Sequence, residues 1–150
     1  MERDSCKFIT RFILSLTSCV LAAPSLARAD STCPPTIAVE QKASSPTADW
    51  TVTYSKYPTE LAQVTIFNGP PKELASLVPD DEKKSKTEMI QTWELPKDSR
   101  GYWIQCDYVN TTAGIYRQLP ATATRCRVTY DLTQHFGDGR WPIKSVKCTP

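Results

Sequence analysis

The 150-residue chain is poor in the residues and motifs on which most enzymes depend. It has one histidine, His135, which falls in a predicted loop. The sequence contains no Gly-x-Ser-x-Gly elbow, no His-Glu-x-x-His motif, no glycine-rich phosphate loop and no calcium-loop pattern. These absences argue against hydrolases, metalloproteases and nucleotide-binding enzymes, so we expect a protein that is not an enzyme. A hydrolase whose triad is assembled in space around His135 is the weakest alternative.

The cysteines are not spaced for metal binding or redox chemistry. Four of the six lie beyond residue 29, at consecutive separations of 73, 20 and 22 residues, and no Cys-x-x-Cys pair occurs. We therefore expect no metal and no other cofactor. An even number of cysteines in an exported chain predicts two disulfides, each contributing about 2–4 kcal/mol to stability. The four residues are Cys33, Cys106, Cys126 and Cys148.

These four cysteines can pair in three ways. Cys126 and Cys148 flank a connection centred near Gly137, which favours a link between neighbouring antiparallel strands. That choice leaves Cys33 with Cys106 and would tie the start of the domain to its middle. The other two pairings stay open at this point.

The first 29 residues have the three-part pattern of a secretory signal peptide. A basic start is followed by a largely apolar stretch at residues 12–23, and small residues at positions 27–29 offer a cleavage site before Asp30. The apolar stretch is too short to be a permanent membrane anchor. We therefore divide the chain into a signal peptide, residues 1–29, and one domain, residues 30–150, that is exported to the periplasm.

A second cleavage pattern lies inside this leader. Residues 16–19, Leu-Thr-Ser-Cys, resemble a bacterial lipobox, which would make Cys19 a lipidated N-terminus. Only a short apolar stretch separates Arg11 from Cys19, however, and apolar residues continue after it. An outer-membrane lipoprotein is therefore the second choice.

The charge of the exported domain gives no basis for nucleic-acid binding. The leader holds 4 of the 18 basic and 2 of the 16 acidic residues, so residues 30–150 carry 14 of each. The charges are unevenly placed, with 7 basic and 11 acidic side chains in residues 30–99 and 7 and 3 in residues 100–150. This polarity suits a charged protein partner and equally suits an ordinary mixed surface.

The stretch of residues 101–109 sets the pattern for the domain. Tyr102, Ile104, Cys106 and Tyr108 alternate there with Trp103, Gln105 and Asp107. Such alternation is typical of a half-buried strand, and the inward cysteine indicates a disulfide-linked core. Strand patterns also occur at residues 36–41, 50–54, 62–67, 87–95, 115–119, 126–132 and 143–148. We expect a mainly β fold of about eight short antiparallel strands, arranged as a sheet, a sandwich or a small barrel, with two disulfides and at most one or two short helical turns.

Two regions are candidates for binding a partner. Residues 69–86 form the longest irregular stretch, in which Leu74, Leu77 and Val78 are spaced for one or two helical turns lying on the sheet. The candidate residues in this stretch are Pro70, Pro71, Asp80, Asp81, Lys83 and Lys84. The second region is the outward side of the strands, where an exposed Trp103 near Arg127 would form a protein-binding hot spot.

Several segments resemble a family of small exported proteobacterial proteins of uncharacterised function. They include Cys33-Pro34, Val-Thr-Ile-Phe-Asn-Gly-Pro-Pro at residues 64–71, Trp-Glu-Leu-Pro at 93–96, Tyr-Trp-Ile-Gln-Cys-Asp-Tyr at 102–108 and Cys-Arg-Val-Thr-Tyr at 126–130. The resemblance covers nearly the whole exported domain. Some members lie near type VI secretion clusters, so the resemblance implies an immunity or inhibitor role in the periplasm, and it supplies no catalytic residues.

Together these patterns predict a non-enzymatic periplasmic domain that binds another protein, as an immunity or inhibitor protein against a cell-wall-degrading toxin. The alternative is a structural or accessory protein of the envelope, lipidated at Cys19.

Overall fold

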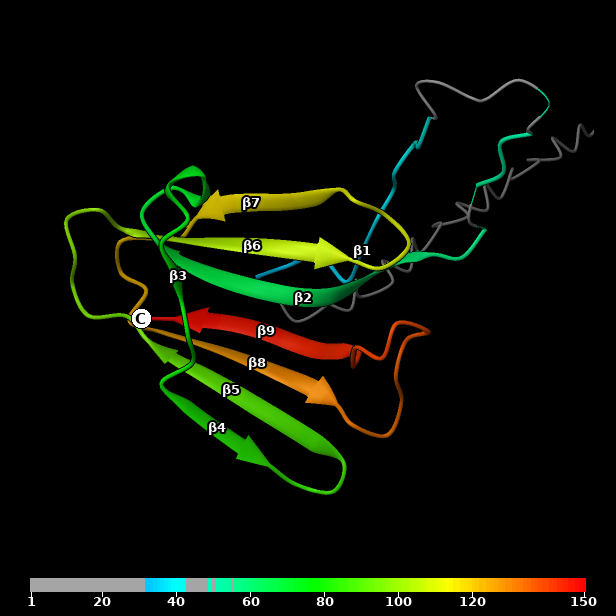
Figure 1. Cartoon of the computed structure of the whole chain (residues 1–150). Helices are drawn as coiled ribbons and strands as arrows, with labels where there is room; N and C mark the ends of the chain where they lie inside the picture. Colours follow the sequence, from blue (N-terminus) through cyan, green and yellow to red (C-terminus); the bar gives the residue numbers. More distant parts are fainter. Residues whose placement is uncertain (1–31, 43–48, 50, 55) are drawn as a thin grey trace, which may run out of the picture.

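Two antiparallel β-sheets share one hydrophobic core in the computed structural model, which describes residues 32–42, 49, 51–54 and 56–150 (Figure 1). The first sheet has the order β1-β2-β6-β7, with β3 also paired to β2, and the second has the order β4-β5-β8-β9. The elements are β1 Thr36–Ile37, β2 Thr59–Asn68, the 3₁₀ turn η1 Pro71–Glu73, β3 Ser76–Leu77, β4 Asp81–Lys84, β5 Glu88–Glu94, β6 Tyr102–Tyr108, β7 Gly114–Gln118, β8 Arg125–Asp131 and β9 Ile143–Thr149. The predicted mainly β class is thus confirmed, and the arrangement is a sandwich.

The central strand β6 shows why this sequence forms two facing sheets. Ile104, Cys106 and Tyr108 are buried, whereas Trp103 and Gln105 on the other face are half-buried. The inward side chains of β2, β5, β8 and β9 follow the same period of two and join those of β6 in one core. Each sheet therefore hides one face against the other, which removes the apolar side chains from water.

The strand expected at residues 36–41 is reduced to Thr36–Ile37. Of the other seven predicted strands, six are present with bounds within three residues of those expected. The exception is residues 50–54, of which 51–54 form no strand and are exposed, while Trp50 lies outside the described residues. Residues 51–54 belong to neither sheet. Alternation alone was misleading here, because it shows which side chains could share a face and not whether a ladder forms.

The predicted signal peptide also lies outside the described residues, so the boundary at residue 29 stays a prediction. In the part of the chain that is described, no helix has the length and apolar character needed to cross a membrane.

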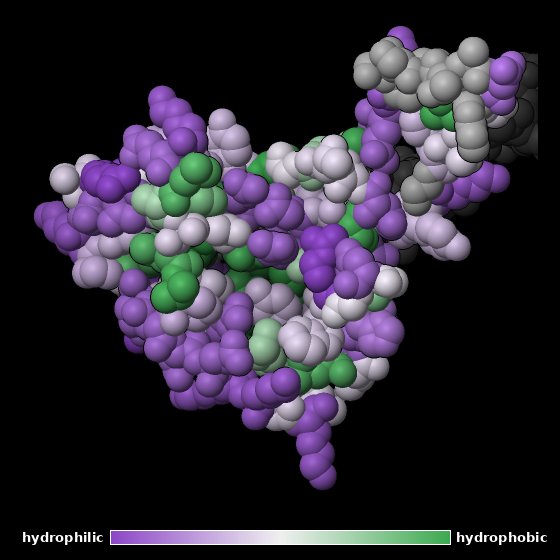
Figure 2. All heavy atoms as spheres, viewed as in Figure 1, coloured by the Kyte–Doolittle hydropathy of each residue, from purple (hydrophilic) through white to green (hydrophobic). Residues whose placement is uncertain are grey.

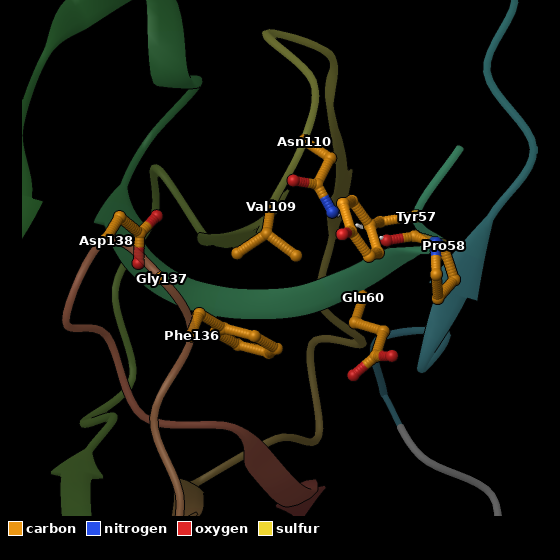
Figure 3. Close-up of a pocket in the computed structure, with 8 residues that line it drawn as sticks. All are labelled: Tyr57, Pro58, Glu60, Val109, Asn110, Phe136, Gly137 and Asp138. Carbon is orange, nitrogen blue, oxygen red and sulfur yellow. Dashed lines mark hydrogen bonds between the residues drawn. The ribbon is translucent and has the colours of Figure 1, made fainter. Parts of the chain in front are cut away.

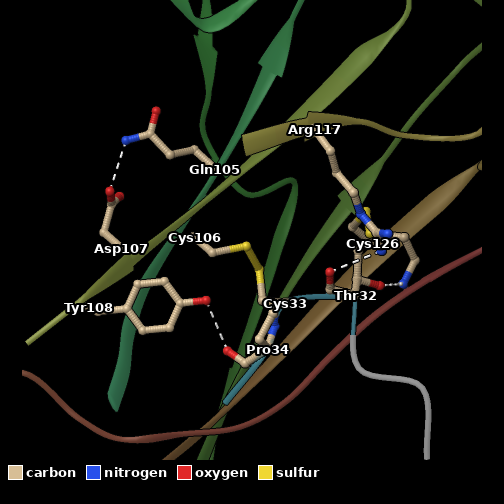
Figure 4. Close-up of a disulfide and its surroundings, with 10 residues drawn as sticks. Thr32, Cys33, Pro34, Gln105, Cys106, Asp107, Tyr108, Arg117 and Cys126 are labelled. Atoms are coloured by element: carbon tan, nitrogen blue, oxygen red, sulfur yellow. Dashed lines mark hydrogen bonds between the residues drawn. A yellow bond between two sulfur atoms is a disulfide. The ribbon is translucent and has the colours of Figure 1, made fainter. Parts of the chain in front are cut away.

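Two disulfides cross-link the core, in the pairing that the sequence favoured. Cys33 is bonded to Cys106 of β6 across 73 residues of chain (Figure 4). Cys126 is bonded to Cys148 between neighbouring positions of β8 and β9. Beside the first link, the Tyr108 hydroxyl donates a 3.0 Å hydrogen bond to the Pro34 carbonyl. The first disulfide and this bond together hold the N-terminal segment against the first sheet.

Residues 69–86 connect the two sheets and contain more regular structure than the sequence indicated. The chain leaves β2, forms η1, returns along β2 as β3 and then enters the second sheet as β4 (Figure 1). The prediction of helical turns lying on the sheet was wrong for Leu74 and Val78, which are 81% and 83% exposed. Only Leu77 of the three packs against the core.

Candidate partner-binding surface

The structure divides the predicted binding residues between the two sheets. Trp103 lies on the outer face of β6, and Pro70 and Pro71 follow β2 in the same sheet. Arg127 lies on the outer face of β8 in the second sheet, with Asp81 nearby in β4. Because the two outer faces point away from the shared core, Trp103 and Arg127 do not form the common patch that the sequence suggested.

Aromatic side chains gather on the outer face of the first sheet. Trp103 stands opposite Phe67 of β2 in the register of the sheet, and its ring centroid is 6.0 Å from that of Tyr116 on β7. Phe67 is buried, Trp103 is half-buried and Tyr116 is 62% exposed. Aromatic surfaces of this kind are enriched at protein interfaces. Tyr116 was not among the predicted residues, although its strand was.

The crossover between β2 and β3 adjoins this sheet and is braced on several sides. The Gly69 N–H donates to the Gly101 carbonyl at 2.9 Å, and the Asn68 N–H donates to the Ala75 carbonyl at 3.0 Å. The Arg100 guanidinium forms an ion pair with the Glu73 carboxylate at 2.6 Å. This network fixes the position of η1 beside the ends of β6 and β7, where Figure 1 shows it.

The braced crossover presents exposed aliphatic side chains. Leu74 follows η1 directly, and Val78 follows β3. In the space-filling view, hydrophobic side chains gather over this part of the chain (Figure 2). The role of this segment in recognition stays a prediction, but the expectation that Leu74 and Val78 lie against the sheet was wrong. The exposure of these two side chains could not be predicted from their spacing alone. The same spacing is compatible with a helical turn packed on the sheet and with a 3₁₀ turn and a short strand whose side chains point into solvent.

The charged residues of β4 are engaged mainly within the second sheet. The Asp80 carboxylate accepts a 2.8 Å hydrogen bond from the Glu94 N–H, and the Asp81 carboxylate lies 3.6 Å from the Lys83 ammonium. The Lys84 ammonium lies 5.3 Å from the centre of the Trp141 ring. Charged side chains on an edge strand also prevent unwanted strand pairing. All four candidate residues, Asp80, Asp81, Lys83 and Lys84, are nevertheless exposed, so their role in binding a partner stays a prediction.

A groove of about 500 Å³ runs along the opposite end of β2 (Figure 3). It is lined by Tyr57, Pro58, Glu60, Val109, Asn110, Phe136, Gly137 and Asp138. Hydrogen bonds from the Arg140 side chain and backbone hold the pKa of the Asp138 carboxyl below its usual value. His135 is exposed, and its Nδ1 lies 3.2 Å from the Phe136 carbonyl oxygen rather than against a carboxylate. The groove is therefore a surface hollow in which apolar side chains such as Phe136 and Val109 lie beside polar ones.

Within residues 32–42, 49, 51–54 and 56–150, no group of three or more histidine, cysteine, aspartate or glutamate side chains is arranged to hold a metal ion. The four cysteines of this region are all consumed by the two disulfides.

Comparison with known proteins identifies the family. The family model described as type VI secretion system Tli immunity protein matches residues 54–149, which include β2 to β9 and the whole crossover. The chain therefore belongs to this family. No curated protein and no solved structure matches it. Membership indicates an immunity protein whose partner is a toxin, in agreement with the resemblance seen in the sequence.

Proposed function

We propose that this protein is a periplasmic immunity protein that binds a toxin delivered by type VI secretion and blocks it by covering its working surface. The family match over residues 54–149 is the observation that carries the proposal. The chain acts by occupying a surface and performs no reaction of its own. The toxin that we propose is an enzyme that degrades the cell wall, a substrate within reach of the periplasm.

The two disulfides support this compartment. Disulfides form and persist in oxidising environments such as the periplasm and are rare in the reducing cytosol. Both links are in the hydrophobic core of this small domain, where Cys33, Cys106 and Cys126 are fully or almost fully buried. An immunity protein that bound its toxin in the reducing cytosol would have to fold without these two disulfides. The predicted signal peptide at residues 1–29 fits the same location.

The rigid architecture supports inhibition by binding. A surface that is already ordered before binding loses little conformational freedom in the complex, and this raises affinity. The crossover is held by backbone hydrogen bonds and by the 2.6 Å ion pair between Arg100 and Glu73. The outer face of the first sheet adds aromatic side chains next to it. This end of the first sheet is where we place the contact with the toxin.

A protection experiment tests the proposal. The toxin encoded beside this chain is directed to the periplasm of a sensitive strain together with either the full chain or a version that lacks residues 1–29. We expect survival only with the full chain, and we expect the purified exported domain to bind the toxin and to stop cell-wall hydrolysis in vitro. Protection by the version without residues 1–29, or absence of binding by the purified domain, would contradict the proposal.

The N-terminus of the exported protein is measured in the same cells by mass spectrometry. A chain that begins at Asp30 supports a periplasmic protein that is free of the membrane. An acylated Cys19 would instead support the lipoprotein alternative, and a Cys19→Ala variant provides the control. If toxin binding is intact while cell-wall hydrolysis is absent, the toxin has a different envelope substrate and only that part of the proposal fails.

A further inference from the structure

Leu74 has a backbone conformation that its own side chain disfavours. Its φ and ψ angles are 58° and 21°, which lie in the left-handed region. A side chain with a β-carbon is strained there, and glycine and asparagine are the usual occupants. Strained residues of this kind tend to occur at functional sites, where the rest of the structure maintains them.

The fold gives no reason for a leucine at this position. The Leu74 side chain is 81% exposed, so it adds little to the core. Its backbone N–H closes η1 by donating to the Pro71 carbonyl at 3.0 Å, a bond that any residue other than proline could make. A glycine would therefore preserve the turn and relieve the strain. The leucine side chain must contribute something other than stability.

Val78 is exposed in a similar way a few residues later. It is 83% exposed, although its neighbour Leu77 packs against the core. The Leu77 carbonyl accepts a 3.3 Å hydrogen bond from the Trp93 indole N–H, which anchors the chain next to Val78. Leu74 and Val78 are thus two aliphatic side chains at either end of the anchored strand β3. We call this pair the aliphatic ridge.

The surroundings of the ridge indicate the chemistry of its partner. Next to Leu74, the charges of Glu73 and Arg100 neutralise each other across 2.6 Å. The exposed Lys72 adds one positive charge at the rim. At the other end, the exposed Asp80 carboxylate lies two residues after Val78. A complementary surface would therefore be an apolar cleft, with an acidic group at the edge that faces Lys72 and a basic group at the edge that faces Asp80.

We propose that the aliphatic ridge inserts into an apolar cleft of the toxin and supplies the main part of the binding energy. This inference rests on the proposed function, because the toxin is the partner. The braced crossover holds both side chains in place before binding, so little ordering is needed when the complex forms. The strain at Leu74 is retained because the side chain is needed in the interface.

The substitution Leu74→Gly separates this role from a structural one. We expect the purified exported variant to unfold at the same temperature as the wild type or higher, because glycine is favoured at positive φ. The probe is the toxin of the protection experiment, made inactive by substitution. We expect the affinity of Leu74→Gly for this toxin to fall by about 30-fold or more, the usual threshold of a hot spot. Leu74→Ala, which keeps the strain and loses the side chain, should bind equally weakly.

Val78→Ala and Val52→Ala form a matched pair. Both remove the same atoms from exposed valines, but Val52 is 39% exposed and lies outside both the crossover and the family match. We expect Val78→Ala to weaken toxin binding by about 5-fold or more and Val52→Ala to change it less than about 2-fold. Because the contact is apolar, raising sodium chloride from about 0.1 M to 0.5 M should change the wild-type affinity by less than about 3-fold.

The outcomes distinguish this inference from the proposed function. If the wild type binds the toxin and Leu74→Gly binds it with the same affinity, the inference about the aliphatic ridge is wrong and the proposed immunity function is unaffected. A clear drop in the unfolding temperature of Leu74→Gly would show that Leu74 serves the fold and would also overturn the inference. Failure of the wild-type chain to bind the toxin would overturn both.

Discussion

Removing the two disulfides in turn should destabilise the domain by different amounts. In the chain-entropy description, a link stabilises a protein by restricting its unfolded state, and the effect grows with the length of chain enclosed. Cys33–Cys106 spans 73 residues, for which that description gives about 4.4 kcal/mol. Cys126–Cys148 spans 22 residues, for which it gives about 3.4 kcal/mol. The longer link should therefore matter more, by about 1 kcal/mol.

The structure adds a local reason for the same order. Cys126 and Cys148 are directly opposite each other in the β8–β9 ladder, so backbone hydrogen bonds continue to hold those strands when the link is absent. Cys33 precedes the short strand β1, which pairs with β2 at only two residues. The rest of its segment is held by separate hydrogen bonds, such as those from the Thr32 N–H to the Val146 carbonyl and from the Tyr108 hydroxyl to the Pro34 carbonyl, and not by a continuous ladder. Loss of Cys33–Cys106 should thus release the N-terminal segment as well as stabilise the unfolded state.

The assay is urea unfolding of the exported domain, followed by tryptophan fluorescence. The double variants Cys33→Ala/Cys106→Ala and Cys126→Ala/Cys148→Ala are compared with the wild type by the free energy of unfolding extrapolated to water, each with its own slope against urea. Hydrogen exchange at residues 32–37 should become fast in the first variant only. A larger loss from the Cys126–Cys148 pair, or a loss below about 1 kcal/mol from both, would refute the reasoning.

Three smaller perturbations test other contacts. Gly69 has a φ of +90°, and a β-carbon there would approach Arg100 Nη2 to 2.7 Å. Gly69→Ala should therefore destabilise the domain by about 1–2 kcal/mol in urea unfolding and also weaken toxin binding. If neither the free energy of unfolding nor the affinity changes, the turn does not brace the crossover. Burial, aided by the charge of a nearby carboxylate, raises the pKa of the Tyr130 hydroxyl from 10.0 to about 12. The stability contributed by the neutral Tyr130 is complete below pH 10 and is lost as the pH rises towards 12. Between pH 10 and 11, the free energy of unfolding should therefore fall more steeply with pH in the wild type than in Tyr130→Phe. Equal pH dependence of the two proteins would contradict the raised pKa. Tyr108→Phe removes the 3.0 Å bond to the Pro34 carbonyl and should cost about 0.5–1.5 kcal/mol in the same urea assay. An unchanged free energy of unfolding would contradict a stabilising role of this bond.

Most of the fold followed from alternation in the sequence. The pattern around Cys106 predicted β6 because a strand with one face in the core repeats every two residues. The same rule located β2, β5, β8 and β9. These strands belong to two different sheets, and their buried residues form one core. The disulfide pairing was favoured for a related reason, since Cys126 and Cys148 lie on strands joined by one connection.

Alternation could not show how strands are shared between two sheets. Trp103 and Arg127 both point outward, but the choice between a common face and opposite faces depends on which strands pair. That choice is made by contacts between residues far apart in the sequence. Residues 51–54 illustrate the converse case, in which a strand pattern occurs in a segment that belongs to neither sheet. Local pattern therefore locates most of the strands and says little about which strands pair and which surfaces they form.

The same distinction explains why the aliphatic ridge escaped sequence analysis. Core positions agree with local preferences, whereas Leu74 contradicts them in both its backbone conformation and its exposure. The strain costs about 1–2 kcal/mol. Each disulfide contributes more than this, about 3.4 kcal/mol for the shorter one. The disulfides therefore more than offset a cost of this size, and a core linked in this way can tolerate an unfavourable residue on its surface.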